Sequence, residues 1–596
     1  MSGSTSNIRE ALDAGLNTEA LDLVRRAAPD RSNVAEIHYL GALACARMGA
    51  IDEAEKWLSQ VDREALGNSP LATEAWGLAG RIAKERYAAA RVGAAARDLA
   101  CIAIDCYRRA FAIGGSAYPA VNAATMAMLS GDAELARTLA REALSALGTS
   151  GDHWHHANWG EALLLLDEID AARTHYAQAW RLAGNQFGAI ASMRRQLLLI
   201  GSTAARNLLD AVPAPCVTAL SGHMIDEKGR AAPRFPARIE QKVGLALRER
   251  LARLGPSIGY AQAACGADIL FLEAMQDAGM QTHVVLPFAK NDFISESVRI
   301  AGDAWIPRFE RALDRATRVV LATEETFFGD EVLFEHAANL VQGMAFLHAA
   351  ELSTQPLMLT VLDPGSPALV GSTAATAAIW MHSGGQIENI DLAALRGVEP
   401  ADRQSDGKKA SAKPSGPAVA RRSLKSLLFA DISGFSGMPE QQTPHFVGMF
   451  LETCARILDS LEPPAVDANT RGDGLFIIFE RPSHAADYAV RLQQAMSLVD
   501  YPAFGLPRDT GVRVGLHTGP VYDIFDPVMS KTAFYGTHVN RAARLEPIVR
   551  TGHIFVTEAF AASLIAEGDE RFRCHYIGAM PLAKRAGEAR LYRLHF

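Results

Sequence analysis

Two aspartates stand where their carboxyl groups could meet. Asp431 ends the apolar run "SLKSLLFAD", and Asp473 lies in a Gly-flanked turn directly ahead of the apolar run "GLFIIF". Asp-Gly between two extended runs is a hairpin signal, so each aspartate could serve only its own turn or cap. If the two runs are neighbours in one sheet, the carboxylates face each other, and a divalent metal usually relieves such repulsion.

The type of ligand indicates which metal would bind. Hard oxygen ligands without Cys or His favour Mg²⁺ or Mn²⁺, and a pair of such ions suits phosphoryl chemistry. The predicted metal set is Asp431, Ile432 and Asp473, holding two ions. The small and Gly residues that follow could curl the backbone so that its amides cradle a polyphosphate, and the predicted substrate contacts there are Gly434, Phe435 and Ser436.

A second group of polar residues lies closer to the C-terminus. Asn540 and Arg544 are four residues apart in "YGTHVNRAARLE", so they share one face of a helix. Lys584 lies in a turn of "LAKRAGEARLY". Cations beside a leaving pyrophosphate would stabilise the charge that develops there. Taken singly, Arg544 and Lys584 are better interpreted as ordinary surface residues.

Five segments resemble, in order, the class III nucleotide cyclase catalytic domain: "FADISGFS", "TRGDGLFIIF", "VRVGLHTGPV", "YGTHVNRAARLE" and "LAKRAGEARLY". The resemblance implies an α+β ferredoxin-like fold and a homodimer with active sites at the interface. The ribose 3′ hydroxyl of a nucleoside triphosphate would attack the α-phosphate and expel pyrophosphate.

The resemblance also implies a role for each residue. Asp431 and Asp473 would bind the two metal ions, Asn540 would orient the ribose, Arg544 would stabilise the transition state, and Lys584 would hold the triphosphate. The aspartates would come from one subunit and the other three residues from its partner.

The base-reading positions that the resemblance implies are Asn469 and Ala533. In that family, Lys with Asp or Thr at these two positions goes with adenine, and Glu with Cys goes with guanine. This chain has neither pair. An Asn offers both a donor and an acceptor, whereas Ala533 contributes only shape. We expect ATP as substrate and 3′,5′-cyclic AMP as product, with GTP, CTP and UTP left open.

The chain has 596 residues, too many for one hydrophobic core, and three domains are expected. The cyclase-like part is residues 422–596, and residues 396–421 read as a flexible linker. Alternating strands and helices in residues 213–395 predict an α/β domain with a parallel sheet. Its segments "SGHMID" and "GYAQAACGADILFLEA" resemble the SLOG family of nucleotide-sensing Rossmann-like domains. This implies a second nucleotide site at Ser221, Gly222, Gly259 and Gly266, unless the domain binds no ligand.

Residues 1–205 are rich in Ala and Leu with helical periodicity, which predicts an all-helical domain. Its paired helices with small residues at the contacts resemble tetratricopeptide repeats, and "AYPAVNAATMAMLSGD" resembles the helical repeats of kinase-associated TRAF-binding domains. Such scaffolds dock protein partners.

The composition narrows the function. The net charge of −8 gives no reason to expect nucleic-acid binding. The start of the sequence does not resemble a signal peptide, and no apolar stretch is long enough to predict a membrane span. We therefore expect a cytoplasmic protein. Two other functions remain: a non-catalytic, nucleotide-binding signalling scaffold, or an enzyme centred on Asp268 and Glu273 of the middle domain.

Overall fold

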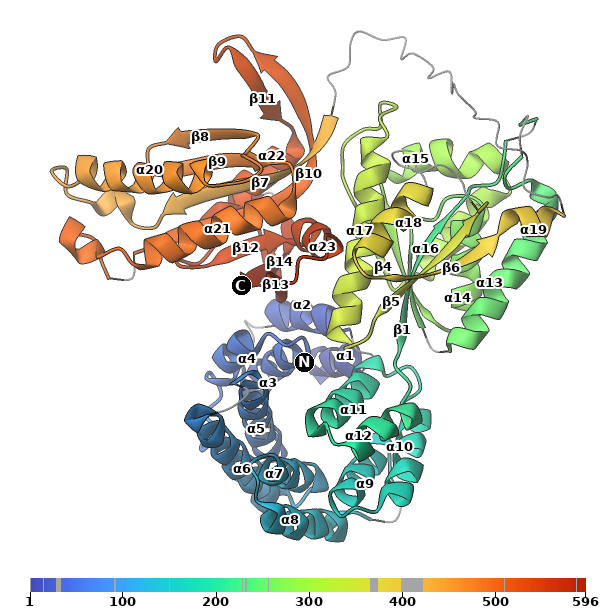
Figure 1. The fold of residues 1–596 in the computed structure, drawn as a ribbon, viewed down its shortest axis with the longest axis vertical. Coiled ribbons are helices and arrows are strands. Elements are labelled where there is room, and N and C mark those ends of the chain that lie inside the picture. The colour runs from blue at the N-terminus through green and yellow to red at the C-terminus, as the bar shows by residue number, and fades with distance from the viewer. Residues whose placement is uncertain are drawn as a thin grey trace. The chain divides into compact units, whose positions relative to one another are not determined.

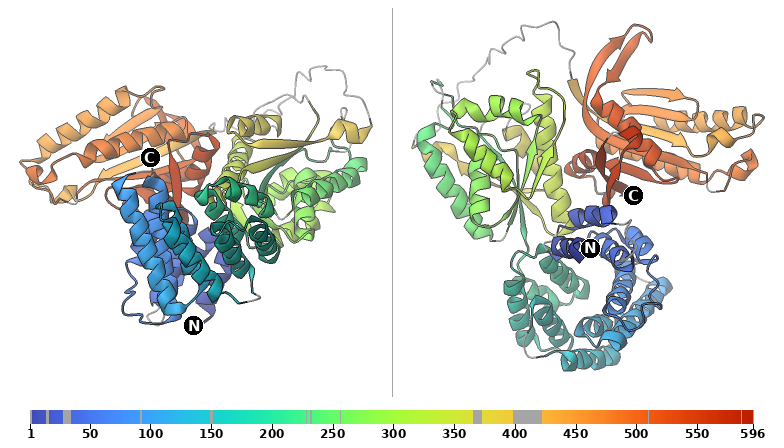
Figure 2. Two further views of the ribbon diagram at one scale, coloured as in Figure 1. Left: turned by 60° about the horizontal axis from the view of Figure 1, so that its bottom comes forward. Right: turned by 180° about the vertical axis from the view of Figure 1, so that it is seen from behind.

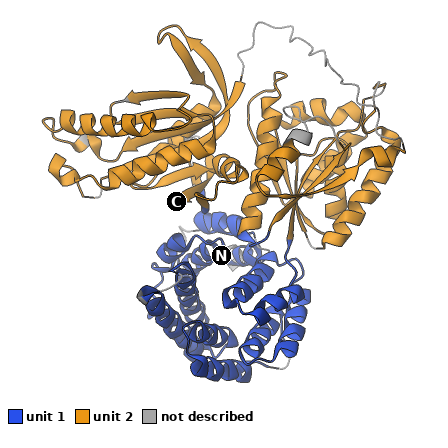
Figure 3. Ribbon diagram, viewed as in Figure 1, with its two compact units in different colours: residues 1–215, 351–354, 575–579 blue, residues 216–350, 355–574, 580–596 orange. Residues whose placement is uncertain are grey.

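The computed structural model describes residues 2–13, 16–27, 34–90, 93–148, 151–227, 229–230, 233–255, 257–364, 373–397, 422–508, 510–585 and 587–595. Most of the predicted linker 396–421 therefore lies outside the described residues. The chain divides into two compact units (Figure 3). One comprises residues 1–215, 351–354 and 575–579, and the other comprises residues 216–350, 355–574 and 580–596.

The N-terminal unit is helical, as predicted. Its helices are α1 (Ser2–Asp13), α2 (Asn17–Ala27), α3 (Val34–Arg47), α4 (Ile51–Leu58), α5 (Pro70–Ala90), α6 (Ala94–Gly114), α7 (Ala117–Leu129), α8 (Ala133–Ala146), α9 (His153–Leu165), α10 (Ile169–Ala183), α11 (Phe187–Ile200) and α12 (Thr203–Asn207). Consecutive helices pair, as in α5 with α6 and α9 with α10, and α1 also packs on α11. The stack of helices therefore curves round until its two ends meet (Figure 2).

Small residues set how closely these helices approach. A Cβ atom at Gly160 of α9 would lie 2.7 Å from the ring of Tyr176 on α10. A Cβ atom at Gly80 of α5 would lie 2.9 Å from the ring of Tyr107 on α6. Because each aromatic ring fills the space of a missing side chain, the two helices of each pair pack closely together.

A buried polar network links four of these helices. The Lys84 ammonium donates to Asn122 Oδ1 and Gln196 Oε1, both at 2.7 Å. The Gln196 amide and the Thr125 hydroxyl both donate to Glu161 Oε1. Burial lowers the pKa of Lys84 to about 8, and burial raises the pKa of Glu161. The network satisfies its polar atoms, but neither charged group is as stable there as in water.

We expect the stability of the helical unit to rise with pH from about 8 to about 10.5, relative to Lys84→Met. In that range the unfolded chain binds the Lys84 proton more tightly than the folded chain, so deprotonation favours folding. The free energy of unfolding can be measured by hydrogen exchange of α5 peptides in urea. The difference in this free energy between the wild-type chain and Lys84→Met should change by about 3 kcal/mol between pH 8 and pH 10.5. A difference that does not change with pH contradicts the assignment.

The middle of the chain forms a six-stranded parallel sheet in the order β4-β3-β2-β1-β5-β6 (Figure 1). The strands are β1 (Cys216–Gly222), β2 (Ser257–Ala261), β3 (Gln281–Leu286), β4 (Arg318–Leu321), β5 (Pro356–Leu362) and β6 (Gln386–Asp391). The helices are α13 (Glu240–Leu254), α14 (Ala267–Asp277), α15 (Lys290–Phe293), α16 (Trp305–Asp314), α17 (Val332–Glu351), α18 (Thr373–His382) and α19 (Leu392–Arg396). The predicted parallel-sheet architecture is therefore confirmed.

The C-terminal part forms an eight-stranded sheet in the order β13-β14-β12-β10-β7-β9-β8, with β11 paired to β10. The strands are β7 (Arg422–Ile432), β8 (Asp467–Arg471), β9 (Gly474–Phe479), β10 (Val512–Asp526), β11 (Lys531–Tyr535), β12 (Ile554–Thr557), β13 (Arg573–Pro581) and β14 (Glu588–His595). The helices are α20 (Thr443–Asp459), α21 (Pro482–Ser497), α22 (Thr537–Leu545) and α23 (Glu558–Ala566).

The two faces of this sheet are covered differently. On one face, the ring of Phe479 on β9 lies 5.8 Å from Tyr488 of α21, and α21 packs between α20 and α23. On the other face, Leu427 of β7 and Ile478 of β9 cluster with Ala542 of the short helix α22. Because side chains alternate along a strand, Asp431 lies on the same face of β7 as Leu427. The first metal candidate therefore lies on the less covered face.

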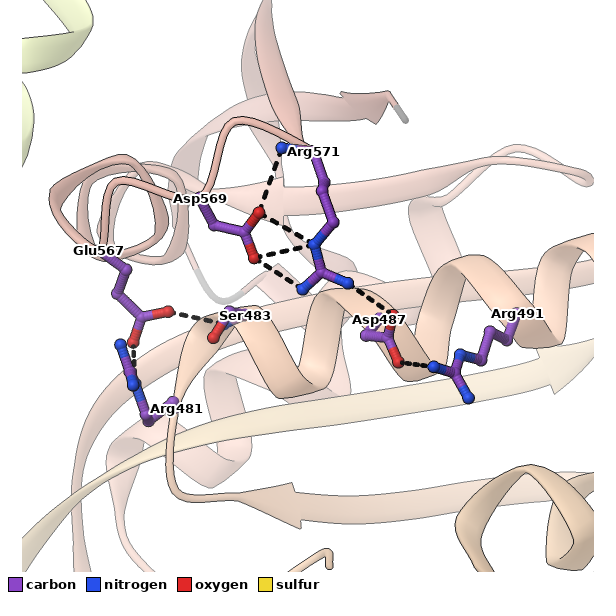
Figure 4. Close-up of polar contacts among 7 residues, drawn as sticks. All are labelled: Arg481, Ser483, Asp487, Arg491, Glu567, Asp569 and Arg571. Atoms are coloured by element: carbon purple, nitrogen blue, oxygen red, sulfur yellow. Dashed lines mark hydrogen bonds and ion pairs between the residues drawn. The ribbon is translucent and has the colours of Figure 1, made fainter. Parts of the chain in front are cut away.

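Exposed ion pairs join α21 to the segment after α23 (Figure 4). Arg481 Nε donates to Glu567 at 2.9 Å, and Arg571 bridges Asp569 and Asp487. Hydrogen bonds from Arg571 lower the pKa of Asp569. Exposed pairs of this kind contribute at most about 1 kcal/mol to stability, so these positions tolerate neutral substitutions.

Two further features concern the chain as a whole. All seven cysteines are free thiols. Among the described residues, no helix is both long and apolar enough to cross a membrane.

Candidate active site

Strand pairing brings Asp431 and Asp473 together. Along β7, Ala430 is opposite Leu475 of β9, and Asp431 is opposite Arg513 of β10. Asp473 lies in the tight turn from β8 to β9, directly before the residues that pair with the end of β7. The predicted neighbourhood of the two aspartates is therefore present, although their metal-binding role remains a prediction.

The two carboxyl groups interact electrostatically. The pKa of Asp473 is raised to about 6, first by burial and then by a hydrogen bond and like charge from Asp431. Two carboxylates that share one site hold a proton more readily than either would alone. The pair therefore favours a cation, or a proton in its place.

Arg513 and Glu546 complete this site, and neither was predicted from the sequence. Arg513 Nη2 lies 2.7 Å from Asp431 Oδ2 and 2.9 Å from Glu546 Oε1. Burial raises the pKa of Glu546 to about 7; Arg513 lowers it, and Asp431 and Asp473 add to the rise. A single arginine within the apolar strand "VRVGLHTGPV" was the available signal for Arg513.

The residues fit a divalent cation of the predicted type. No cluster of three or more His, Cys, Asp or Glu side chains that could hold a metal occurs in the described ranges. Mg²⁺, however, is usually held by one or two carboxylates together with substrate phosphates and water. Asp431 and Asp473 supply those two carboxylates, and Ile432 adds main-chain atoms beside the first.

The turn after Asp431 has its backbone amides available for a phosphate. Gly434 has φ = +80°, a conformation that favours glycine, and a single 3₁₀ turn over Phe435–Gly437 follows. Ser433 holds the turn in place, because its amide and its hydroxyl both donate to the Gly511 carbonyl. Among the backbone hydrogen bonds of the described residues, none uses the amide of Gly434, Phe435 or Ser436. The side chain of Ser436 lies outside the description.

The second predicted group lies on other elements. Asn540 and Arg544 are one turn apart on α22, and Lys584 lies in a 3₁₀ turn over Ala583–Arg585 that packs beside α22. Lys584 has φ = +58°, which is uncommon for a residue with a side chain and suits a tight turn. None of the contacts described for this chain joins these three residues to Asp431 or Asp473.

The base-reading candidates lie on two strands that are not paired with each other. Asn469 is in β8, at the edge of the sheet, and Ala533 is in β11, which extends from β10. Both side chains are partly exposed. Their roles remain predictions.

The second nucleotide site needs a correction at Gly259. This residue lies inside β2, where it pairs with Thr218 and Thr282, and not in a turn. A Cβ atom there would lie 2.9 Å from Phe271 Cζ and from Met275 Cε, so the glycine makes room for core side chains. It presents no loop backbone to a ligand.

The other three predicted positions surround the start of α14. Ser221 and Gly222 end β1 at the point where the strand order reverses towards β5, a common ligand position in such sheets. A Cβ atom at Gly222 would lie 2.3 Å from Ala267 Cβ, and one at Gly266 would lie 2.7 Å from Ile225 N. Close packing within the protein thus explains these two glycines.

Amides near this helix start are already satisfied. Asp268 Oδ2 accepts from the amides of Ala263 and Ala264 at 3.2 and 3.1 Å, and the Ala267 amide donates to His223 O. Burial raises the pKa of Asp268 to about 7. The predicted phosphate-binding amides therefore have protein partners, and nucleotide binding here stays a prediction without structural support.

The alternative active site in the middle domain also loses its two candidates. Asp268 caps backbone amides, as described above. Glu273 binds Arg308 through two hydrogen bonds of 2.6 and 2.8 Å, and Arg308 also binds Glu240. Both acids are thus committed to holding the fold together.

Comparison with protein families identifies two parts of the chain. Residues 420–595 match the adenylate and guanylate cyclase catalytic domain, so the C-terminal part is a class III cyclase catalytic domain and the protein is a nucleotide cyclase. Residues 17–127 match the family described as Tetratricopeptide Repeats-Sensor. This chain therefore carries a cyclase domain together with an N-terminal tetratricopeptide-type repeat domain.

Solved structures of cyclase domains are similar to the C-terminal part. The guanylate cyclase domain of RhGC from Catenaria anguillulae is 16% identical, and the match covers 30% of this chain and 98% of that chain with a TM-score of 0.26. The adenylyl cyclase CyaB from P. aeruginosa is 16% identical, with 30% and 96% covered and a TM-score of 0.26. An adenylate cyclase from Trypanosoma brucei is 23% identical, with 31% and 92% covered and a TM-score of 0.25. Comparison with curated proteins gave no match.

The raised pKa of Asp473 predicts a pH dependence of metal binding. A proton competes with the cation below about pH 6, so Mn²⁺ should bind the full chain several-fold more weakly at pH 5.5 than at pH 7.5. Isothermal titration of Mn²⁺ at both pH values measures this. In Asp473→Asn the binding should be weak at both pH values. An unchanged pH dependence in that variant would contradict the assignment.

Proposed function

We propose that this protein converts ATP to 3′,5′-cyclic AMP and pyrophosphate, at a site built around Asp431 and Asp473. The observation that supports this proposal most directly is the meeting of these two carboxyl groups at the end of β7. The solved structures named above include both adenylyl and guanylyl cyclases, and the choice of ATP over GTP is part of this proposal.

The catalytic roles in this proposal are those that the resemblance to class III cyclases implies. Two Mg²⁺ or Mn²⁺ ions, held by Asp431, Asp473 and the main chain at Ile432, would activate the 3′ hydroxyl and neutralise phosphate charge. The amides of Gly434, Phe435 and Ser436 bind phosphate oxygens. Asn540 orients the ribose, while Arg544 and Lys584 stabilise the charge that develops as pyrophosphate leaves. The protein acts mainly by positioning and charge compensation.

A homodimer would bring the two groups of residues together. Asp431 and Asp473 lie at one end of β7, whereas Asn540, Arg544 and Lys584 lie on α22 and the turn beside it. The hairpin of β10 and β11 exposes large apolar side chains, with Phe525 64% and Val528 92% exposed. Contiguous exposed apolar side chains of this kind often mark an interaction site, and a second copy of the chain is the proposed partner.

The remaining domains have regulatory roles in this proposal. The repeats dock a protein partner, and the middle domain responds to a ligand near Ser221, Gly222 and Gly266. Either event would change the arrangement of the cyclase dimer. The cytoplasmic location inferred from the sequence belongs to the same proposal.

The substitution Asp473→Asn tests the metal role. Asn tolerates the same turn, so the fold should persist, but loss of one negative ligand should lower Mn²⁺-dependent formation of cyclic AMP by at least about a hundredfold. The product is measured by mass spectrometry. Asp487→Asn removes a carboxylate from an exposed ion pair on α21 and serves as the matched control. Undiminished turnover in Asp473→Asn would exclude the metal role.

Mixing two inactive variants tests the shared site. Asp473→Asn and Asn540→Ala should each be inactive alone, because each damages both sites of its own dimer. In a mixed dimer, one site receives both intact halves, so subunit exchange should restore about a quarter of the wild-type rate. No recovery, with exchange verified by mass, would show that each site is built from a single chain.

A further inference from the structure

Asn469 is bound on both sides by charged side chains. Lys531 Nζ donates to Asn469 Oδ1 at 3.1 Å and to Asp467 Oδ1 at 2.6 Å. Asn469 Nδ2 in turn donates to Asp467 Oδ2 at 2.8 Å. The three residues thus form a closed ring of hydrogen bonds between β8 and β11, two strands that are not paired.

The chemistry of the partners fixes the orientation of the Asn469 amide. An ammonium group can only donate, so the Asn469 oxygen must face Lys531. A carboxylate can only accept, so the amide nitrogen must face Asp467. These two contacts leave Asn469 one N–H and one oxygen lone pair, and they hold its amide plane against Asp467 and Lys531. The Lys531 ammonium retains one N–H, and the Asp467 carboxylate retains unused lone pairs.

A flat aromatic surface lies next to this polar ring. Asn469 is opposite Phe476 of β9, and the ring of Phe476 stacks on Phe429 of β7 with centroids 4.5 Å apart and planes 20° apart. Both aromatic side chains are only partly buried, on the face of the sheet that α22 leaves partly open. The Lys531 side chain is 33% exposed and the Asp467 side chain is 14% exposed, so both remain within reach of a ligand.

We propose that Lys531 and Asp467 read the base of the substrate, and that Asn469 is a positioning residue that holds them. This inference rests on the proposed function and on the base-reading positions that the resemblance implies, Asn469 and Ala533. Lys531 is two residues before Ala533 on β11, and its four-carbon stem brings the ammonium to Asn469. The short side chain of Ala533 leaves space on the same face of the strand.

The charged pair selects by hydrogen-bond direction. Adenine presents an acceptor at N1 and an amino donor at N6, which match the Lys531 ammonium and the Asp467 carboxylate. Guanine presents N1–H and O6 at the same places, so a donor would face the ammonium and an acceptor would face the carboxylate. A site built for one hydrogen-bond pattern rejects the reversed pattern, because the bound base covers polar groups that it leaves unpaired.

The same pattern predicts the order of the other nucleotides. Cytosine presents N3 and an N4 amino group, which repeat the adenine pattern, whereas uracil presents N3–H and O4, which repeat that of guanine. A purine also covers more of the Phe429 and Phe476 surface than a pyrimidine does. We therefore expect affinity to fall from ATP to CTP and to be lowest for GTP and UTP.

A binding experiment with nucleotides that cannot cyclise tests the proposal. The probes are 3′-deoxy-ATP and 3′-deoxy-GTP with Mn²⁺, titrated into the full chain by calorimetry. The wild-type chain should prefer 3′-deoxy-ATP by about tenfold to a hundredfold. Lys531→Met and Asp467→Asn keep the size of each side chain, and each should remove most of this preference. Arg571→Met and Asp569→Asn, in the exposed pair of Figure 4, are matched controls that should retain it.

The outcomes separate this inference from the proposed function. A wild-type chain without a preference for 3′-deoxy-ATP, or a preference that survives both Lys531→Met and Asp467→Asn, overturns the base-reading role. If both variants lose the preference for 3′-deoxy-ATP, the base-reading role is supported. If in addition no cyclic product forms from ATP, that result contradicts the cyclase reaction and leaves the base-reading role standing. A wild-type chain that binds neither probe contradicts both.

Discussion

The repulsion between two carboxyl groups at the end of β7 is the constraint on which the chemistry of the C-terminal domain depends. Pairing of β7 with β9 and β10 fixes Asp431, and the β8 to β9 turn fixes Asp473 beside it. Without a substrate, Arg513 neutralises part of this charge and is itself shared with Glu546. Holding two like charges close together lowers the stability of the fold, and it creates a site that favours cations.

The uneven cover of the sheet explains how the domain meets other molecules. Helices α20, α21 and α23 cover one face, which closes the hydrophobic core there. The short helix α22 packs on the other face, where the stacked rings of Phe429 and Phe476 are partly exposed. Aromatic surface beside charged side chains suits a nucleoside, since one part of the ligand is flat and apolar and its edge is polar.

The sequence predicted the elements of this site better than their contacts. Asp431 and Asp473 could be found because each lies at the end of an apolar run, a local pattern. Arg513 could not be assigned, because its partner Asp431 lies 82 residues away in the chain. The same holds for Lys531, whose partners Asn469 and Asp467 lie 62 and 64 residues away. Gly259 was assigned to the second nucleotide site because its segment resembles the SLOG family. Its pairing within β2 and its packing against Phe271 and Met275 place it inside a strand.

The amino-acid sequence by itself determined the helical N-terminal region, the parallel sheet of the middle region and the cyclase domain at the C-terminus. Periodicity and turn chemistry act over a few residues, so the order of residues records them directly. Only the tertiary structure decided that amides before α14 are already satisfied by Asp268, and that Lys531 and Asp467 hold Asn469 from both sides. Such contacts depend on the register between strands and on the path of the chain between them, and no local pattern of residues specifies either.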